Sequence, residues 1–157
     1  MLSYKIEELD FLFIYEHKVR ELENLCLSAP GLKDLSFAEN MEELRYLQLN
    51  ENSNITDLSP LTNIADSLII LDLSYCYELS DFAPVSKLYN LEYLGLDACQ
   101  VDDLSFASGL DNLDSISISE VTIDTLEPIK DLPSLEYIYA WDATINDYAG
   151  LQDLVYE

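Results

Sequence analysis

Basic residues are scarce in this chain. Seven Lys and Arg stand against 31 Asp and Glu, so the formal net charge is −24 over 157 residues. After residue 45 only Lys87 and Lys130 remain, against 21 carboxylates. A field of this sign repels DNA, RNA and anionic membranes and speeds encounter with a basic protein. Direct nucleic-acid binding is therefore disfavoured and a basic protein partner is favoured; the alternative is that the charge only maintains solubility.

Residues on which most enzyme sites depend are also rare. None of the four glycines stands in a phosphate-binding loop, and His17 is the only histidine that could serve a Ser or Cys hydrolase as base. No Cys and His cluster is spaced for zinc, and Asp102-Asp103 alone is a weak calcium signal without the rest of a calcium-binding loop. We expect a protein that is not an enzyme, with no cofactor and no metal.

Long apolar runs are missing as well. No stretch approaches the roughly 18 residues that indicate a membrane-spanning helix. The first residues, MLSYKIEELDFLFIYEHK, lack the basic segment, apolar core and small-residue cleavage site of an export signal. We expect a cytoplasmic protein, unless an export signal was removed from the natural chain.

Leucine, in contrast, recurs at a regular spacing. The kernel L-x-x-L-x-L, with conservative replacements, begins six times at intervals of 22 to 24 residues: at Leu22, Leu44, Leu68, Leu91, Leu113 and Leu135. Self-similarity at about 20–29 residues with this kernel is typical of leucine-rich repeats, whose units bury their apolar faces only by stacking. The alternation within each kernel predicts a strand with one buried face. We predict an α/β solenoid: a leucine-rich repeat horseshoe of about six to seven repeats, with a parallel concave sheet and short 3₁₀ or helical convex segments.

The two ends depart from the regular repeat. Residues 22–157 hold the six repeats, and we expect residues 1–21 to form an N-terminal capping strand or truncated repeat. In this segment 9–14 (LDFLFI) repeats the kernel, but only 13 residues before Leu22. No polar capping helix follows residues 151–156. Because terminal repeats normally cover their core edge, self-association into a homo-oligomer through the C-terminal end is an open alternative.

The second half of each repeat carries turn signals. In 57–61 (DLSPL) we expect Ser59 to cap a short helix or 3₁₀ turn whose first residue is Pro60. One aspartate column should accept backbone N–H groups of this turn: Asp34, Asp57, Asp81, Asp103 and Asp147. Cys76 and Cys99 fall eight residues after a kernel leucine, where we expect buried, reduced thiols that satisfy backbone groups; a disulfide between them in an oxidising compartment is the alternative.

With this register the chain resembles the short bacterial leucine-rich repeats of internalins, whose units read LxxLxLxxNxIxDLSPLxxL. The resemblance covers about residues 22–151, and its most specific match is 55–61 (ITDLSPL). It implies a solenoid fold and a binding role. The wall-anchoring regions of internalins have no counterpart in this sequence.

A binding function would lie on the concave face. Its outward positions are the third, fifth and seventh of each kernel, and in the last repeat they present Tyr137, Tyr139 and Trp141, the only tryptophan, side by side. Aromatics with a polar group dominate interface hot spots. An alternative is that these three form a C-terminal cap or a homodimer contact. The candidate partner-binding residues are Tyr46, Asp72, Tyr93, Asp97, Glu120, Tyr137, Tyr139, Trp141 and Asp142.

These features favour a non-catalytic module that binds a protein, expected to be basic, on an acidic concave face. The most concrete version is an immunity or antitoxin protein against a nuclease-like toxin, a strategy that resembles that of ribonuclease inhibitors. Alternatives are an internalin-like adhesin or receptor fragment, and an acidic mimic of nucleic acid that blocks a nucleic-acid-binding protein. The protein-binding module and the nucleic-acid mimic are distinguished by whether the aromatic residues or only the carboxylates matter for binding.

Overall fold

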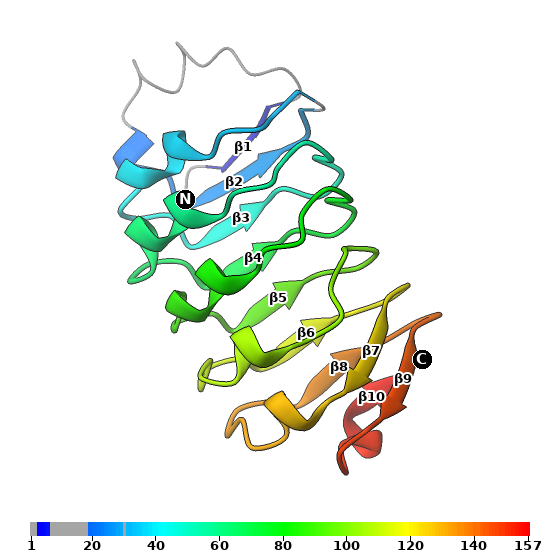
Figure 1. The fold of residues 1–157 in the computed structure, drawn as a ribbon. Helices are drawn as coiled ribbons and strands as arrows, with labels where there is room; N and C mark the ends of the chain where they lie inside the picture. The colour runs from blue at the N-terminus through cyan, green and yellow to red at the C-terminus, as the bar shows by residue number, and fades with distance from the viewer. Residues whose placement is uncertain (1–2, 7–18, 30) are drawn as a thin grey trace.

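The dominant element of the fold is a parallel sheet of eight strands. The computed structural model describes residues 3–6, 19–29 and 31–157. The strands lie side by side in the order β1-β2-β3-β4-β5-β6-β8-β10, from the N-terminal to the C-terminal end of the solenoid (Figure 1). They are β1 (Ser3–Ile6), β2 (Asn24–Leu27), β3 (Tyr46–Gln48), β4 (Ile70–Asp72), β5 (Tyr93–Gly95), β6 (Ser115–Ser117), β8 (Tyr137–Tyr139) and β10 (Val155–Tyr156).

Short 3₁₀ helices make the return path of each coil. They are η1 (Val19–Glu21), η2 (Ser36–Asn40), η3 (Ser59–Ile64), η4 (Ala83–Lys87), η5 (Ser105–Ala107), η6 (Glu127–Ile129) and η7 (Gln152–Leu154). A second parallel sheet pairs β7 (Thr122–Thr125) with β9 (Thr144–Asp147) beside the C-terminal coils (Figure 1). The predicted solenoid, with its parallel sheet and short 3₁₀ return segments, is confirmed.

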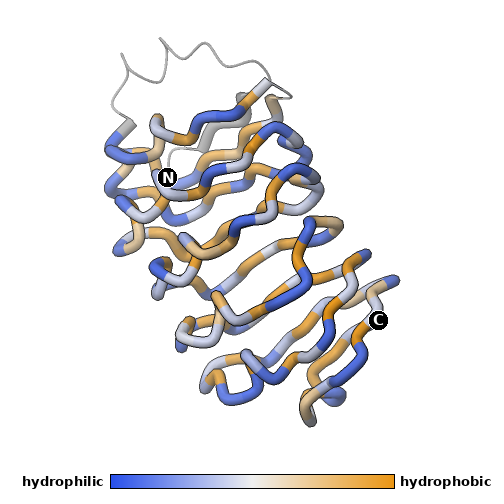
Figure 2. The backbone as a smooth tube through the Cα atoms, viewed as in Figure 1, coloured by the Kyte–Doolittle hydropathy of each residue, from blue (hydrophilic) through white to orange (hydrophobic). Residues whose placement is uncertain are grey.

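The core is a stack of aliphatic columns, one residue per repeat. Strand register aligns the fourth kernel position of successive repeats, and from β2 to β8 this column is fully buried: Leu25, Leu47, Leu71, Leu94, Ile116 and Ile138. Figure 2 shows the apolar segments recurring along successive coils. Each coil buries its apolar residues only against the coils beside it, which makes stability a sum of neighbour contacts.

An aspartate column lies in the return path of the coils. Asp57 Oδ1 accepts the N–H of Ser59 at 2.8 Å, and equivalent bonds run from residue i+2 to Asp34, Asp81, Asp103 and Asp147 at 2.7–3.0 Å. Hydrogen bonds from Ser59, first from its side chain and then from its backbone, hold the pKa of Asp57 below its ordinary value. The predicted structural role of this column is confirmed.

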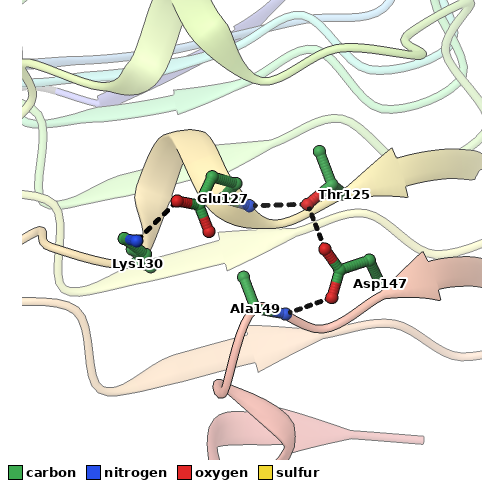
Figure 3. A network of polar contacts seen from close by, with 5 residues as sticks. All are labelled: Thr125, Glu127, Lys130, Asp147 and Ala149. Atoms are coloured by element: carbon green, nitrogen blue, oxygen red, sulfur yellow. Dashed lines mark hydrogen bonds and ion pairs between the residues drawn. The ribbon is translucent and has the colours of Figure 1, made fainter.

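The predicted cap is corrected by the same geometry. Ser59 is the first residue of η3 rather than its cap, and Leu58 before it makes no side-chain capping bond. The aspartate two residues upstream caps the turn instead, because its carboxylate reaches over the intervening apolar residue. Repeat five places Thr125 in the column: its hydroxyl accepts the N–H of Glu127 and donates to Asp147 Oδ2 at 3.0 Å (Figure 3).

A second column satisfies the turn that follows the strands. Asn52 is fully buried; its Nδ2 donates to the carbonyls of Leu27 and Leu49, and its Oδ1 accepts the N–H of Ala29. In the next two repeats the thiols of Cys76 and Cys99 donate to the carbonyls of Leu49 and Leu73 at 3.3 and 3.2 Å. The prediction of buried, unbridged thiols at these positions is confirmed.

The strand beside β2 is β1 (Ser3–Ile6), with Tyr4 in register with Leu25. The capping strand that we predicted at 9–14 lies outside the described residues. At the other end, η7 and β10 follow the last repeat, and β10 pairs with β8. The sheet therefore continues one strand further than the six predicted repeats, and Ile145, Leu151 and Val155 stay half-buried at this end.

Candidate functional site

Most of the predicted site residues lie in two groups on the concave face, one near its middle and one at its C-terminal end. Tyr46, Asp72 and Tyr93 lie on the adjacent strands β3, β4 and β5, near the middle of the sheet. Asp97 lies two residues past the end of β5. Tyr137 and Tyr139 lie on β8, and Trp141 follows in the turn. Aromatic exposure increases toward the C-terminal end: Tyr46 and Tyr93 are half-buried, whereas Tyr139 and Trp141 are 43% and 63% exposed.

The two central carboxylates take part in the fold. Asp97 Oδ1 accepts the hydroxyl of Ser117 at 2.6 Å and the N–H of Ser119 at 2.7 Å. Asp72 Oδ1 accepts the N–H of Ser74 at 3.0 Å. Both carboxylates therefore give the face negative charge; Asp97 also links its repeat to the next one, whereas the Asp72 bond stays within its own repeat.

Gly95 makes room for this arrangement. A Cβ at this position would lie 2.7 Å from Asp72 Oδ1 and 3.1 Å from Ser74 Oγ, so a side chain would displace the carboxylate. Beside it, burial raises the pKa of Tyr93 to about 12, with further contributions from the charges of Asp72 and Asp97. The Tyr93 side chain thus stays neutral on a concave face that carries negative charge.

Three tyrosines meet at the C-terminal end of the face. The rings of Tyr137 and Tyr139 are nearly parallel, at an interplanar angle of 9° with centroids 6.3 Å apart. Tyr156 of β10 lies 5.8 Å from Tyr137 and 6.0 Å from Tyr139, centroid to centroid. We call Tyr137, Tyr139 and Tyr156 the tyrosine ledge. Their exposed fractions, 37%, 43% and 50%, show a surface that is packed within itself and open to solvent.

Tyr156 is a candidate site residue that the sequence does not reveal. It aligns with Tyr139 in the sheet but follows it by only 17 residues, whereas Tyr139 follows Ser117 by 22. Because the last coil is short, the repeat period does not predict that Tyr156 aligns with Tyr139. A tyrosine preceded by an apolar residue at the end of the 151–156 segment is the one signal that could have indicated it.

Glu120 and Asp142 lie on a rim where the strands end. In each of the second to sixth repeats one residue takes a left-handed backbone conformation there, with φ between 53° and 64°: Glu51, Tyr75, Ala98, Glu120 and Asp142. Bonds to the next repeat hold this conformation, as when the N–H of Glu120 donates to the Trp141 carbonyl at 2.9 Å. Glu120 Oε1 also accepts the Tyr75 hydroxyl at 3.4 Å. The rim therefore places carboxylates beside Trp141, the most exposed of the predicted aromatic residues.

The surroundings of the ledge are acidic. Glu136 and Asp114 lie at the starts of β8 and β6, and the N–H of Glu136 donates to the Asp114 carbonyl at 2.8 Å. The charge of Glu136 is the largest of the influences that raise the pKa of Tyr137. On the far side, Tyr148 donates its hydroxyl to Glu157, the residue after Tyr156.

A separate groove of about 460 Å³ lies where the strands begin, lined by residues that include Glu43, Arg45, Asp66 and Glu92. It contains none of the predicted site residues. Within 3–6, 19–29 and 31–157, no group of three or more His, Cys, Asp or Glu side chains is placed to hold a metal ion. No helix in the same ranges is long and apolar enough to cross a membrane.

The fold is similar to solved structures of internalins from Listeria monocytogenes. With internalin C2 the TM-score is 0.75 at 28% sequence identity, over 85% of this chain and 57% of that one. With the internalin inlF the TM-score is 0.63 at 24% identity, over 91% of this chain and 47% of that one. No protein-family model matches the sequence.

This protein is thus a leucine-rich repeat protein with internalin-like repeats, as predicted. The chain spans about half the length of the internalins it matches.

Proposed function

We propose that this protein is a non-catalytic interaction module that binds a basic protein on its concave face. The observation that carries the proposal is the gathering of exposed aromatic side chains at the C-terminal end of that face. Tyr137 and Tyr139 stand on a strand paired on both sides, so their backbone is already ordered before a partner arrives. Pre-ordered aromatic side chains lose little entropy on binding and often dominate interface energetics.

The charge distribution supports a basic partner. Residues 88–157 contain 15 Asp and Glu and one basic residue, Lys130. Lys130 follows η6 and forms an ion pair with Glu127, away from the sheet (Figure 3). A cationic surface would meet attraction over the whole C-terminal half, which raises association rates and makes them salt-dependent.

In its most specific form, the proposal is an immunity or antitoxin protein that acts in the cytoplasm on a nuclease-like toxin. A nuclease must present a basic surface to hold nucleic acid, and an acidic concave face would compete for that surface. The buried, unbridged thiols of Cys76 and Cys99 are compatible with a reducing compartment.

The proposal is tested by site-directed photo-cross-linking. A photo-reactive amino acid replaces Tyr139 in one sample and Tyr77 in the control; Tyr77 is 50% exposed but lies in a turn outside the sheet. Each sample is incubated with lysate of the source organism, and the joined protein is identified by mass spectrometry. We expect a protein of pI above about 9 to be joined from position 139 and not from 77.

The other outcomes contradict the proposal in distinct ways. Equal cross-linking from both positions would move the contact to the acidic surface at large, as expected of a nucleic-acid mimic. A second copy of this chain joined near position 139 would indicate self-association through the C-terminal end. No intracellular protein from either position would favour an internalin-like adhesin or receptor with an extracellular ligand.

A further inference from the structure

The tyrosine ledge has a geometry that selects one kind of side chain within the proposed basic partner. Three phenol rings lie within 6.3 Å of one another, centroid to centroid. Rings packed in this way usually exclude solvent, yet each remains 37% to 50% exposed. The face is therefore a preformed aromatic surface of fixed shape.

Negative charge borders this surface on more than one side. Glu136 precedes Tyr137 on the chain, Asp114 lies at the start of the neighbouring strand, and Glu157 follows Tyr156. The negative ring faces and these carboxylates act in the same direction, because both attract a cation. Lys130 is the only basic residue after Lys87 in the sequence, and it is paired with Glu127.

A guanidinium fits this combination better than an ammonium. Its planar, weakly hydrated head stacks on aromatic rings, while its N–H groups can donate to carboxylates at the border. A lysine ammonium keeps its hydration shell more tightly and has no flat face to stack.

We propose that the tyrosine ledge binds an arginine side chain of the protein partner, with the guanidinium stacked on the phenol rings and its N–H groups directed to the bordering carboxylates. This inference rests on the proposed function, because it names the contact that the concave face makes with its basic partner. It also assigns a role to β10, which supplies Tyr156 and completes the ledge.

The test uses the full chain and two blocked peptides that differ only in the cation: Gly-Arg-Gly-Arg-Gly and Gly-Lys-Gly-Lys-Gly. Binding is followed by two-dimensional NMR and by fluorescence of Trp141, the only tryptophan, which lies two residues after the end of β8. We expect the arginine peptide to bind at least about threefold more tightly than the lysine peptide, as the strength of an exposed cation–π contact implies. Shifts should concentrate on β8 and β10.

Variants separate the ledge from general charge. Tyr156→Ala should weaken arginine-peptide binding about threefold and bring the two peptides to similar affinities, whereas Tyr156→Phe should keep the preference. Tyr77→Ala, which removes an equally exposed ring elsewhere, should change neither affinity. Circular dichroism of each variant verifies that the solenoid is folded.

Equal affinities for the two peptides in the wild type, no binding of either, or an unchanged preference in Tyr156→Ala would overturn the inference. The proposed function would survive any of these results if a basic protein is still joined from position 139. It would fail by itself if cross-linking shows no preference for the concave face, whatever the peptides do.

Discussion

Asn52 offers the sharpest test of how the repeats are held together, because its side chain links two coils at the turn. Its amide makes three buried hydrogen bonds, at 2.9, 2.8 and 2.7 Å, to Ala29 N, Leu27 O and Leu49 O. Asn52→Ala removes all of them. Leu49 O keeps the thiol of Cys76 as a donor, but Ala29 N and Leu27 O lose this partner.

The expected loss of stability follows from the two backbone groups that lose their partner, Ala29 N and Leu27 O. Leaving a buried backbone group unsatisfied costs about 1–3 kcal/mol each, so we expect Asn52→Ala to lower the free energy of unfolding by about 4 kcal/mol. Asn52→Cys is the matched control, because Cys76 and Cys99 fill the same column in the next repeats. One S–H donor is retained, so about half of the loss should be recovered.

Urea unfolding followed by circular dichroism measures both changes. Far-ultraviolet signal is the right probe, since Trp141 reports on the opposite end of the solenoid. A loss below about 1 kcal/mol for Asn52→Ala, or equal losses for both variants, would refute the view that this column satisfies the turn.

Three further predictions concern the backbone, the thiols and the overall charge. Ala98→Gly should raise the free energy of unfolding by about 1 kcal/mol in urea unfolding, because Ala98 has φ 55°, which costs a residue with a Cβ about 1–2 kcal/mol; a lower stability would contradict this. Burial raises the pKa of Cys76 and Cys99 from 9.0 to about 11 and about 12. The unfolded chain therefore loses these protons first, and stability should fall as pH rises above 9, by up to about 1.4 kcal/mol per pH unit per thiol. Unfolding curves at pH 8, 9 and 10 for wild type and Cys99→Ala check this, since the variant should show a shallower fall. Moderate salt should raise the melting temperature in calorimetry, because 31 carboxylates repel one another more in the folded chain; a decrease would contradict the charge argument.

The solenoid was predictable because every repeat carries the same pattern of apolar residues in the same register. Alternating apolar positions set the buried column from Leu25 to Ile138, and the aspartates two residues before η2, η3, η4 and η5 each accept a local backbone N–H. These features depend on residues close in sequence or on the period itself, so a single chain is enough to read them.

The ends were less predictable because their coils differ in length or composition. β1 keeps the spacing, with Tyr4 paired 21 residues before Leu25, but the segment SYKI lacks the leucines that mark a kernel. The last coil keeps apolar residues but is short, so Tyr156 was missed as a ledge residue. Asp72 and Asp97 were predicted as partner-binding carboxylates. Asp72 accepts the N–H of Ser74 two residues further on, whereas the bond of Asp97 to Ser117 depends on geometry between repeats that the sequence alone does not give.

The sequence placed Tyr137 and Tyr139 together on the outward face because strand periodicity alone decides which side a residue takes. It placed Trp141 with them, but this residue lies past the strand end, where its backbone N–H donates to Ser119 Oγ at 3.2 Å. The turn decides its orientation, and turns depend on contacts with the neighbouring repeat.

Binding of a basic protein through the aromatic end of the concave face is the central proposal for this protein. The most direct measurement uses the partner that cross-linking identifies, purified by itself. Its affinity for wild type and for the Tyr139→Ala, Trp141→Ala variant is measured by calorimetry at about 50 and 300 mM salt. We expect the variant to bind at least about tenfold more weakly, because hot-spot aromatics contribute about 1.4 kcal/mol or more, and both proteins to weaken at the higher salt. Equal affinities for variant and wild type, or binding indifferent to salt, would contradict it.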